Sequence, residues 1–153
     1  MIPLTNQEKA AYLNKYRKAV NDIKIASEEL QTWREIATRI SPQYSGMPHG
    51  SDGSDKLQTA VLEIAELSES IEQHIRETKK LRAQVQQVID GVEDNTLQTL
   101  LTYRYIQGKK WEEIALLMCY DYRYVKKLHK KALFAIQVKE DMERHPNSVI
   151  TLQ

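Results

Sequence analysis

KWEEIALLMCYDYRYVKKLHKKAL, residues 110–133, predicts two short helices joined by a turn. Ile114, Ala115 and Met118 fall on one face of the first helix. A polar break at Tyr120-Asp121 follows, and Asp121 is expected to cap the second helix, because its carboxylate can accept the free N–H groups of the first turn. The second helix has an apolar stripe made of Val125, Leu128, Ala132 and Leu133. Together these features indicate a helix-turn-helix.

The other face of the second helix carries cations without acidic neighbours, since no Asp or Glu lies between residues 122 and 139. A cationic helix that projects from a small core is typical of proteins that enter the major groove of double-stranded DNA. The competing interpretation is a solvated surface that binds nothing. Aromatic residues interleave with the cations near the helix start and favour DNA. The candidate DNA-binding residues are Tyr122, Arg123, Tyr124, Lys126, Lys127, Lys130 and Lys131.

The net charge of +1 hides an uneven distribution along the 153 residues. Residues 94–139 hold nine Lys or Arg and four acids, a net of +5, whereas residues 1–93 have a net of −2. The last fourteen residues contribute a further −2. The positive field is therefore local to the C-terminal module, which favours a DNA-facing head on a near-neutral body.

Several residues of this module match a known family. Glu112-Glu113-Ile114-Ala115 and Ala132-Leu133 lie at matching positions, and Arg104-Tyr105-Ile106 with Gly108 match the preceding helix. On these residues the stretch resembles region 4 of primary sigma factors. The whole chain resembles small phage regulators with such a C-terminus, including an uncharacterised phage family and the ArpU-like late-gene regulators, and there the likeness extends to residues 47–56.

The sequence departs from the sigma pattern at two positions. Cys119 stands where a turn glycine is usual, which leaves the turn geometry open, and Asp121 replaces a Ser or Thr cap. Cys119 is expected to pack as a small apolar residue in the turn.

The resemblance implies a sequence-specific, phage-encoded transcriptional regulator of late or lytic genes, in the cytosol of a bacterial host. It aligns Tyr122, Arg123, Tyr124 and Lys127 with positions that reach bases, and it places Lys126 and Lys130 nearer phosphate. It leaves open a contact with host RNA polymerase.

The N-terminal part predicts two long helices, so the fold class is all-α. Residues 6–40 repeat apolar or small residues in alternating steps of four and three, the heptad seam of a coiled coil. A Gly/Pro/Ser-rich loop over 41–54 separates this helix from a second one over about 55–90. We expect residues 1–91 to form a long antiparallel helical hairpin. The seam consists of Tyr12, Tyr16, Ala19, Ile23, Ala26, Leu30, Trp33, Ala37 and Ile40.

A small three-helix domain is expected over residues 92–145. Its first helix covers about 95–107, capped by Asp94 or Asn95, and its last continues to about residue 142. Residues 146–153 are predicted to be a flexible tail. The expected core consists of Leu100, Leu101, Trp111, Ile114, Val125 and Leu128.

The regular seam also favours self-association. A two-helix hairpin leaves apolar flanks uncovered, and Leu13, Val20 and Ile25 are the candidates. A homo-oligomer, with a dimer favoured, would present two recognition helices to paired half-sites.

Other chemistry finds no support in the sequence. The four histidines (49, 74, 129 and 145) have no metal-ligand spacing, Glu112-Glu113 lacks partners for acid–base catalysis, and no phosphate-cradling motif is present. We therefore predict no enzyme activity, catalytic residue, cofactor or metal site. The single cysteine and the polar N-terminus fit a reducing cytosol without a membrane segment. His129 is expected to lie along the cationic helix near phosphate, and Trp111 in the core.

Two other functions stay open. A small terminase-like subunit for DNA packaging also joins a helix-turn-helix to oligomerising helices, although it usually places the DNA-binding part first. A ring of eight or more subunits would favour packaging, and a dimer would favour regulation. A sigma-like module that binds RNA polymerase without its own DNA contact is the other alternative.

Overall fold

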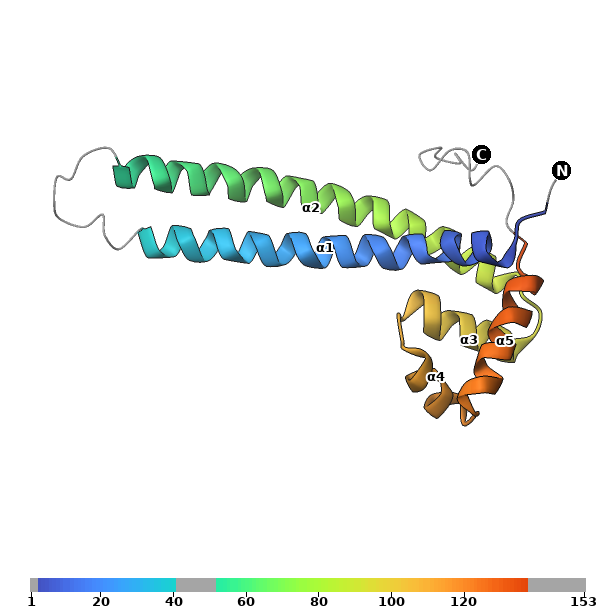
Figure 1. The fold of residues 1–153 in the computed structure, drawn as a ribbon. Coiled ribbons are helices and arrows are strands. Elements are labelled where there is room, and N and C mark those ends of the chain that lie inside the picture. Colours follow the sequence, from blue (N-terminus) through green and yellow to red (C-terminus); the bar gives the residue numbers. More distant parts are fainter. Residues whose placement is uncertain (1–2, 41–51, 138–153) are drawn as a thin grey trace. The chain divides into compact units, whose positions relative to one another are not determined.

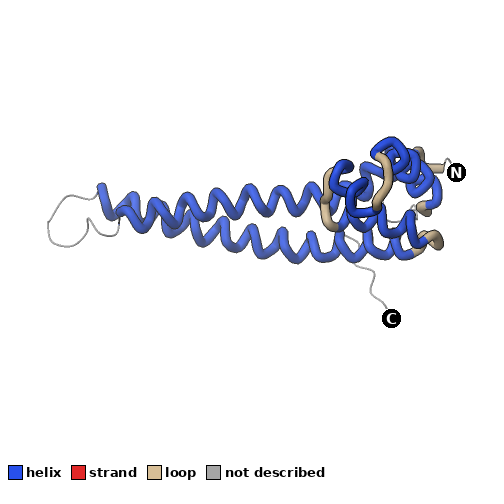
Figure 2. Tube along the Cα trace, turned by 90° about the horizontal axis from the view of Figure 1, so that it is seen from below, coloured by secondary structure: helices blue, strands red, loops and turns tan. Residues whose placement is uncertain are grey.

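The computed structural model describes residues 3–40 and 52–137 (Figure 1). Every regular element in these ranges is helical, which confirms the all-α class (Figure 2). None of the described helices has an apolar stretch long enough to cross a bilayer. The elements are α1 (Asn6–Ile40), α2 (Asp52–Asp90), α3 (Asn95–Leu101), the π-helix η2 (Thr102–Ile106), α4 (Trp111–Met118) and α5 (Tyr122–Ala135).

The chain divides into two compact units. The composite unit combines Met1–Arg17 with Lys80–Gln153, and the two-helix unit is Lys18–Lys79. Helices α1 and α2 each contribute to both units. Residue 91, expected from the sequence as a domain boundary, lies inside the composite unit.

The two-helix unit contains the later part of α1 and the earlier part of α2, which lie side by side (Figure 1). Every seam position of α1 in this unit is half-buried, as the heptad spacing predicts. On α2 the stripe is less regular, because Val61 and Ile75 are exposed. Helix α2 begins at Asp52, three residues earlier than predicted, and the remaining expected loop, 41–51, lies outside the described residues. The buried side chains described in this unit are Ala60, Ile71 and Thr78.

Helix α1 begins with a capping box at Thr5 and Glu8. The Thr5 N–H donates to the Glu8 carboxylate at 2.7 Å, and the Glu8 N–H donates to the Thr5 hydroxyl at 3.2 Å. These bonds satisfy donors that a helix start otherwise leaves free. Hydrogen bonds from Thr5 also hold the pKa of Glu8 below its usual value. The helix start predicted at residue 6 is thereby explained.

The composite unit has a core to which the first turns of α1 contribute directly. Tyr12 and Leu13 pack with the last turns of α2, and with residues of α3, η2 and α5. Leu13 is completely buried, so the prediction that it forms an uncovered flank for self-association is wrong. Of the other two predicted flank residues, Val20 is half-buried and Ile25 is exposed. The core cluster comprises Tyr12, Leu13, Val85, Val88, Ile89, Val92, Leu101, Tyr105, Ile106, Ala132, Leu133 and Ile136.

The helix predicted over 95–107 has two parts. Asp94 caps α3 by accepting hydrogen bonds from the N–H groups of Thr96 and Leu97, which confirms one of the two predicted caps. The π-helix η2 then follows without a break, and its wider turns accommodate an extra residue. This insertion explains why Ile106 is buried, although regular α-helical spacing from Leu97 and Leu101 would favour residues 104 and 105.

Gly108 ends this helical run in the left-handed region, with φ of 68°. A side chain at this position would also meet the guanidinium group of Arg17, which donates a hydrogen bond to the carbonyl of Ile106. Glycine is therefore favoured by its backbone angle, and an added side chain would in addition have to displace the flexible end of Arg17.

Candidate nucleic-acid interface

Helices α4 and α5 are held together by a second apolar cluster, which also takes in α3. Its buried members are Leu100, Ile114, Ala115, Val125 and Leu128, and Trp111 and Met118 pack against it. Five of the six residues predicted as the core therefore belong here. The sixth, Leu101, lies in the larger cluster of the composite unit.

The turn between α4 and α5 depends on Cys119. This residue adopts the left-handed conformation (φ 58°, ψ 39°), the only non-glycine residue with positive φ in the described ranges. The Cys119 N–H donates to the carbonyl of Leu116, and the Tyr120 N–H donates to that of Ala115. These are the two bonds of a Schellman motif, so the turn forms without the usual glycine. Cys119 is exposed, and the prediction that it packs in the turn is wrong.

Asp121 is the residue before α5 and has an extended backbone, as an N-cap requires. Its side chain makes no capping hydrogen bond, however, which contradicts the predicted cap. The position of the helix start is therefore as predicted, while the stabilising contact is absent.

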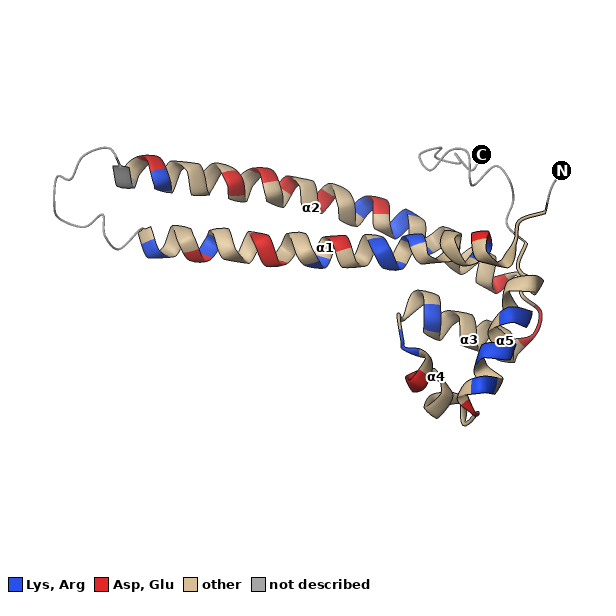
Figure 3. Ribbon diagram, viewed as in Figure 1, with Lys and Arg blue, Asp and Glu red and all other residues tan. Residues whose placement is uncertain are grey.

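The outer face of α5 is cationic. Arg123, Lys127, Lys130 and Lys131 are exposed, opposite the buried stripe of the same helix. Figure 3 shows Lys and Arg positions along α5. Within residues 3–40 and 52–137, none of these four cations forms an ion pair. A charge row that is not neutralised by its own protein keeps its attraction for an external polyanion.

Lys126 differs from the other cations of α5. It is half-buried, and its ammonium nitrogen lies 4.5 Å from the centre of the Trp111 ring. The guanidinium carbon of Arg104, from η2, lies at the same distance from this ring. Trp111 thus links three elements through cation–π contacts. Arg104 was not among the predicted site residues, because nothing in the local sequence indicates that it meets Lys126 at one ring.

His129 faces inward rather than along the cationic surface. Its Nε2 lies 2.6 Å from the Tyr105 hydroxyl, and its ring lies 4.5 Å from that of Trp111. Burial, together with the charges of Lys126 and Arg104, lowers the pKa of His129 to about 4. The expected phosphate contact of this residue is therefore wrong, since a neutral, half-buried imidazole occupies the site at neutral pH. Burial likewise raises the pKa of Tyr105 to about 12.

The C-terminal end of α5 is fixed by the start of α1. The Lys9 ammonium donates to the carbonyl of Leu133 at 3.0 Å, and the Asn6 amide donates to that of Lys130 at 3.5 Å. A cation at a helix C-terminus also interacts favourably with the helix dipole. Helix α5 ends at Ala135, seven residues before the predicted end, and residues from 138 onward lie outside the described ranges.

Tyrosines surround the start of α5. Tyr122 and Tyr124 are exposed by 43% and 46%, so both remain accessible to a ligand. Tyr124 also forms an edge-to-face contact with Tyr120, with ring centres 5.0 Å apart. The aromatic residues predicted to accompany the cations thus lie at the surface.

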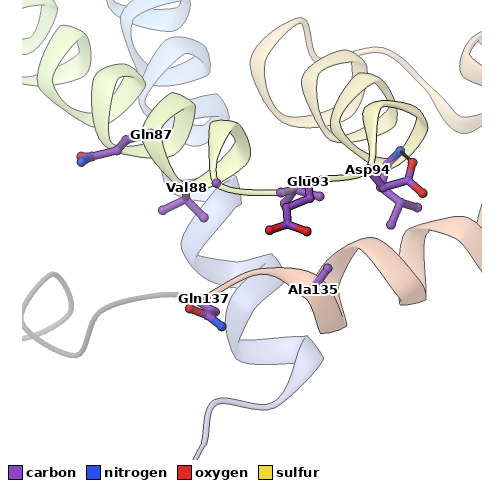
Figure 4. Close-up of a pocket in the computed structure, with 9 residues that line it drawn as sticks. Gln87, Val88, Glu93, Asp94, Ala135 and Gln137 are labelled. Atoms are coloured by element: carbon purple, nitrogen blue, oxygen red, sulfur yellow. Dashed lines mark hydrogen bonds between the residues drawn. The ribbon is translucent and has the colours of Figure 1, made fainter.

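A groove of about 600 Å³ lies between the end of α2, the segment before α3 and the end of α5 (Figure 4). Glu93, Asp94 and glutamine side chains line it, and Asp94 is already engaged as the cap of α3. The acidic lining does not suit a polyanion. In the described part of the chain, no three His, Cys, Asp or Glu side chains gather as a metal site would require.

Comparisons of this chain with protein-family models, with curated proteins and with solved structures found no match. Its function must therefore be argued from the geometry of the site.

Proposed function

We propose that this chain is a sequence-specific DNA-binding regulator of transcription, with α4, the Cys119 turn and α5 as its helix-turn-helix. One observation carries the proposal: the exposed cations of α5 form a row without ion pairs in the described ranges, opposite a completely buried stripe. The regulatory role on phage late or lytic genes is supported by the sequence resemblance to sigma region 4 and to small phage regulators.

In the proposed complex, α5 enters the major groove with its first turn leading. Arg123 lies in that turn and can donate two hydrogen bonds to one guanine, which would discriminate by about 1–3 kcal/mol. Lys127, Lys130 and Lys131 supply contacts to phosphate, which add affinity without sequence information. Lys126 contributes less directly, because it lies on Trp111 and helps to fix the helix.

The long helices complete the proposal as an antiparallel hairpin that brings two copies together. The half-buried seam and the exposed Ile25 and Val61 in the two-helix unit support such a role, because further helices would cover these side chains. Light scattering checks this part. A dimer agrees with the regulatory role, and a strict monomer excludes self-association through the long helices. A ring of eight or more subunits favours DNA packaging instead.

Charge reversal tests the DNA contact directly. The double variant K127E/K130E should lose most DNA affinity at moderate salt, and the slope of log K against log salt should become shallower by about 0.9 for each lost phosphate contact. The matched control is K79E/K80E, which changes the net charge equally at two exposed positions of α2. Fluorescence anisotropy with fragments selected from the parent genome measures both.

Two outcomes would overturn the proposal. Equal losses in both variants would indicate a general effect of net charge, and unchanged binding of K127E/K130E would exclude α5 from the interface. The conservative variant R123K should retain affinity for DNA in general and lose discrimination at one base pair, because lysine cannot form the paired hydrogen bonds of arginine.

A further inference from the structure

Helix α4 has an exposed face that differs in chemistry from the outer face of α5. Ile114 and Ala115 are buried, whereas Leu116 is exposed by 81% and Leu117 by 52%. Both leucines lie in a helix of eight residues, directly before the turn. Exposed single leucines are ordinary, but Leu116 and Leu117 are adjacent and both exposed on one short helix.

The same face carries two acids. Glu112 precedes Leu116 by one helical turn, and Glu113 precedes Leu117 by the same spacing, so each acid lies next to a leucine along the helix. We define Glu112, Glu113, Leu116 and Leu117 as the α4 outer face. It has a net charge of −2 and no cation.

This composition excludes DNA as the occupant of the face. Two carboxylates would be placed against phosphate without a compensating cation, and the leucines offer neither hydrogen bonds nor positive charge. The acids have a local explanation, since they lie in the first turn of α4 and interact favourably with its dipole. The leucines have none, because their exposure to water has no compensating contact within the described residues.

We propose that the α4 outer face docks an amphipathic helix of another protein, one with an apolar row flanked by Lys or Arg. The apolar row would cover Leu116 and Leu117, and the basic flank would lie against Glu112 and Glu113. Helix-on-helix packing suits a short exposed helix, because side chains spaced three and four residues apart interlock along both. The charge complementarity selects a basic partner over an acidic one.

The contact would be small. Eight helical residues extend about 12 Å, so the face accommodates about two turns of a partner helix. We therefore expect weak, reversible binding in the micromolar range, as is common for transient contacts of this size. The proposal does not depend on DNA binding by α5, and it specifies the chemistry of a protein partner whichever role the chain has.

A displayed library of helical peptides of about 15 residues tests the proposal. The full chain is the bait, and the counter-selection uses L116Q/L117Q, which removes the apolar groups and keeps good helix formers. Recovered peptides should share an apolar row with flanking Lys or Arg. A recovered peptide, made synthetically, should bind the double variant at least about tenfold more weakly. The control L62Q removes a leucine of α2 whose exposure, 57%, is close to that of Leu117, and it should change nothing.

A second variant separates the charge from the apolar contact. E112K/E113K should reject the basic peptides and favour acidic ones. The proposal fails if the recovered peptides bind L116Q/L117Q unchanged, if they are acidic, or if none survives counter-selection. It also fails if light scattering shows that L116Q/L117Q lowers the mass of an oligomer, because the occupant would then be a second copy. DNA affinity should stay the same in L116Q/L117Q. A loss of DNA binding in this variant would count against the proposed arrangement of the DNA contact on α5, separately from the result with the peptides.

Discussion

The composite unit and the two-helix unit are both helical, yet they bury their apolar side chains very differently. Of the nineteen buried hydrophobic residues in the described ranges, seventeen lie in the composite unit and two, Ala60 and Ile71, lie in the two-helix unit. The seam of the two-helix unit is only half-buried along α1. Its regular heptad pattern therefore predicts the helices correctly, but it does not indicate a closed apolar core.

The difference shows where stability comes from. In the composite unit, parts of six helical elements (α1, α2, α3, η2, α4 and α5) surround the buried side chains, so each deletion leaves a cavity. In the two-helix unit, one helix covers only one side of its neighbour, and water can fill the space of a removed side chain. The proposed DNA contact lies on the composite unit, where packed neighbours can hold a side chain in a fixed position.

The largest expected effect breaks the core of the composite unit. Leu13→Ala should lower the free energy of unfolding by about 2–5 kcal/mol, because Leu13 is completely buried among residues of other helices. Leu30→Ala, the same change at a half-buried seam position, should cost only about 1 kcal/mol. Urea denaturation followed by circular dichroism measures both. Equal costs would show that the two units do not differ as described.

A second test separates backbone geometry from burial within the composite unit. Gly108→Ala should destabilise by about 1–2 kcal/mol, because Gly108 has a left-handed backbone and an added side chain must displace Arg17. Gly91→Ala should change stability by less than about 0.5 kcal/mol, since Gly91 lies outside the left-handed region and has ordinary contacts. Thermal unfolding compares the two variants. A similar loss at Gly91 would point to a general intolerance of this unit to side chains.

The third test concerns the pH dependence that His129 gives to the composite unit. Its pKa is about 4 in the folded chain and about 6.5 when unfolded, so the unfolded state binds the proton more tightly. The stability that neutral His129 provides should be complete above pH 6.5 and should decline as the pH falls toward 4. Substitution of His129 by Gln keeps an acceptor for Tyr105 and should remove this part of the slope. Denaturation midpoints at several pH values measure it, and an unchanged slope would contradict the inward position of His129.

The smallest expected effect is a gain at the turn. Cys119→Gly should stabilise the chain by about 0.5–1 kcal/mol, because glycine adopts the left-handed conformation without strain. Cys119→Ala retains a side chain and should give no gain. Chemical denaturation of the three proteins decides, and a loss in Cys119→Gly would show that the thiol makes a stabilising contact.

The sequence predicted the local features well. The start and end of α1, the seam, the cap at Asp94 and the start of α5 follow from short-range patterns that depend on neighbours within one or two turns. The π-helix at 102–106 was not predicted, although Ile106, five residues after Leu101, does not fit regular α-helical spacing and could have revealed it. The early end of α5 was also missed, because no proline or glycine marks it.

The candidate site was predictable in composition and less so in arrangement. Arg123, Lys127, Lys130 and Lys131 are exposed, as expected for the polar side of an amphipathic helix. By contrast, Lys126 and His129 are turned toward Trp111 and Tyr105 by contacts with residues far away in the sequence. No local pattern encodes such contacts, nor those of Asn6 and Lys9 with the carbonyls of α5.

The position of Tyr12 and Leu13 has a consequence for how the proposed DNA-binding module could be transplanted. Excision from residue 92 onward would strip Leu101, Tyr105 and Leu133 of the apolar neighbours that cover them. The isolated fragment would expose these apolar side chains to water. A graft onto another scaffold would therefore have to include the first turns of α1 and the last turns of α2. These supporting turns are therefore a structural part of the module itself.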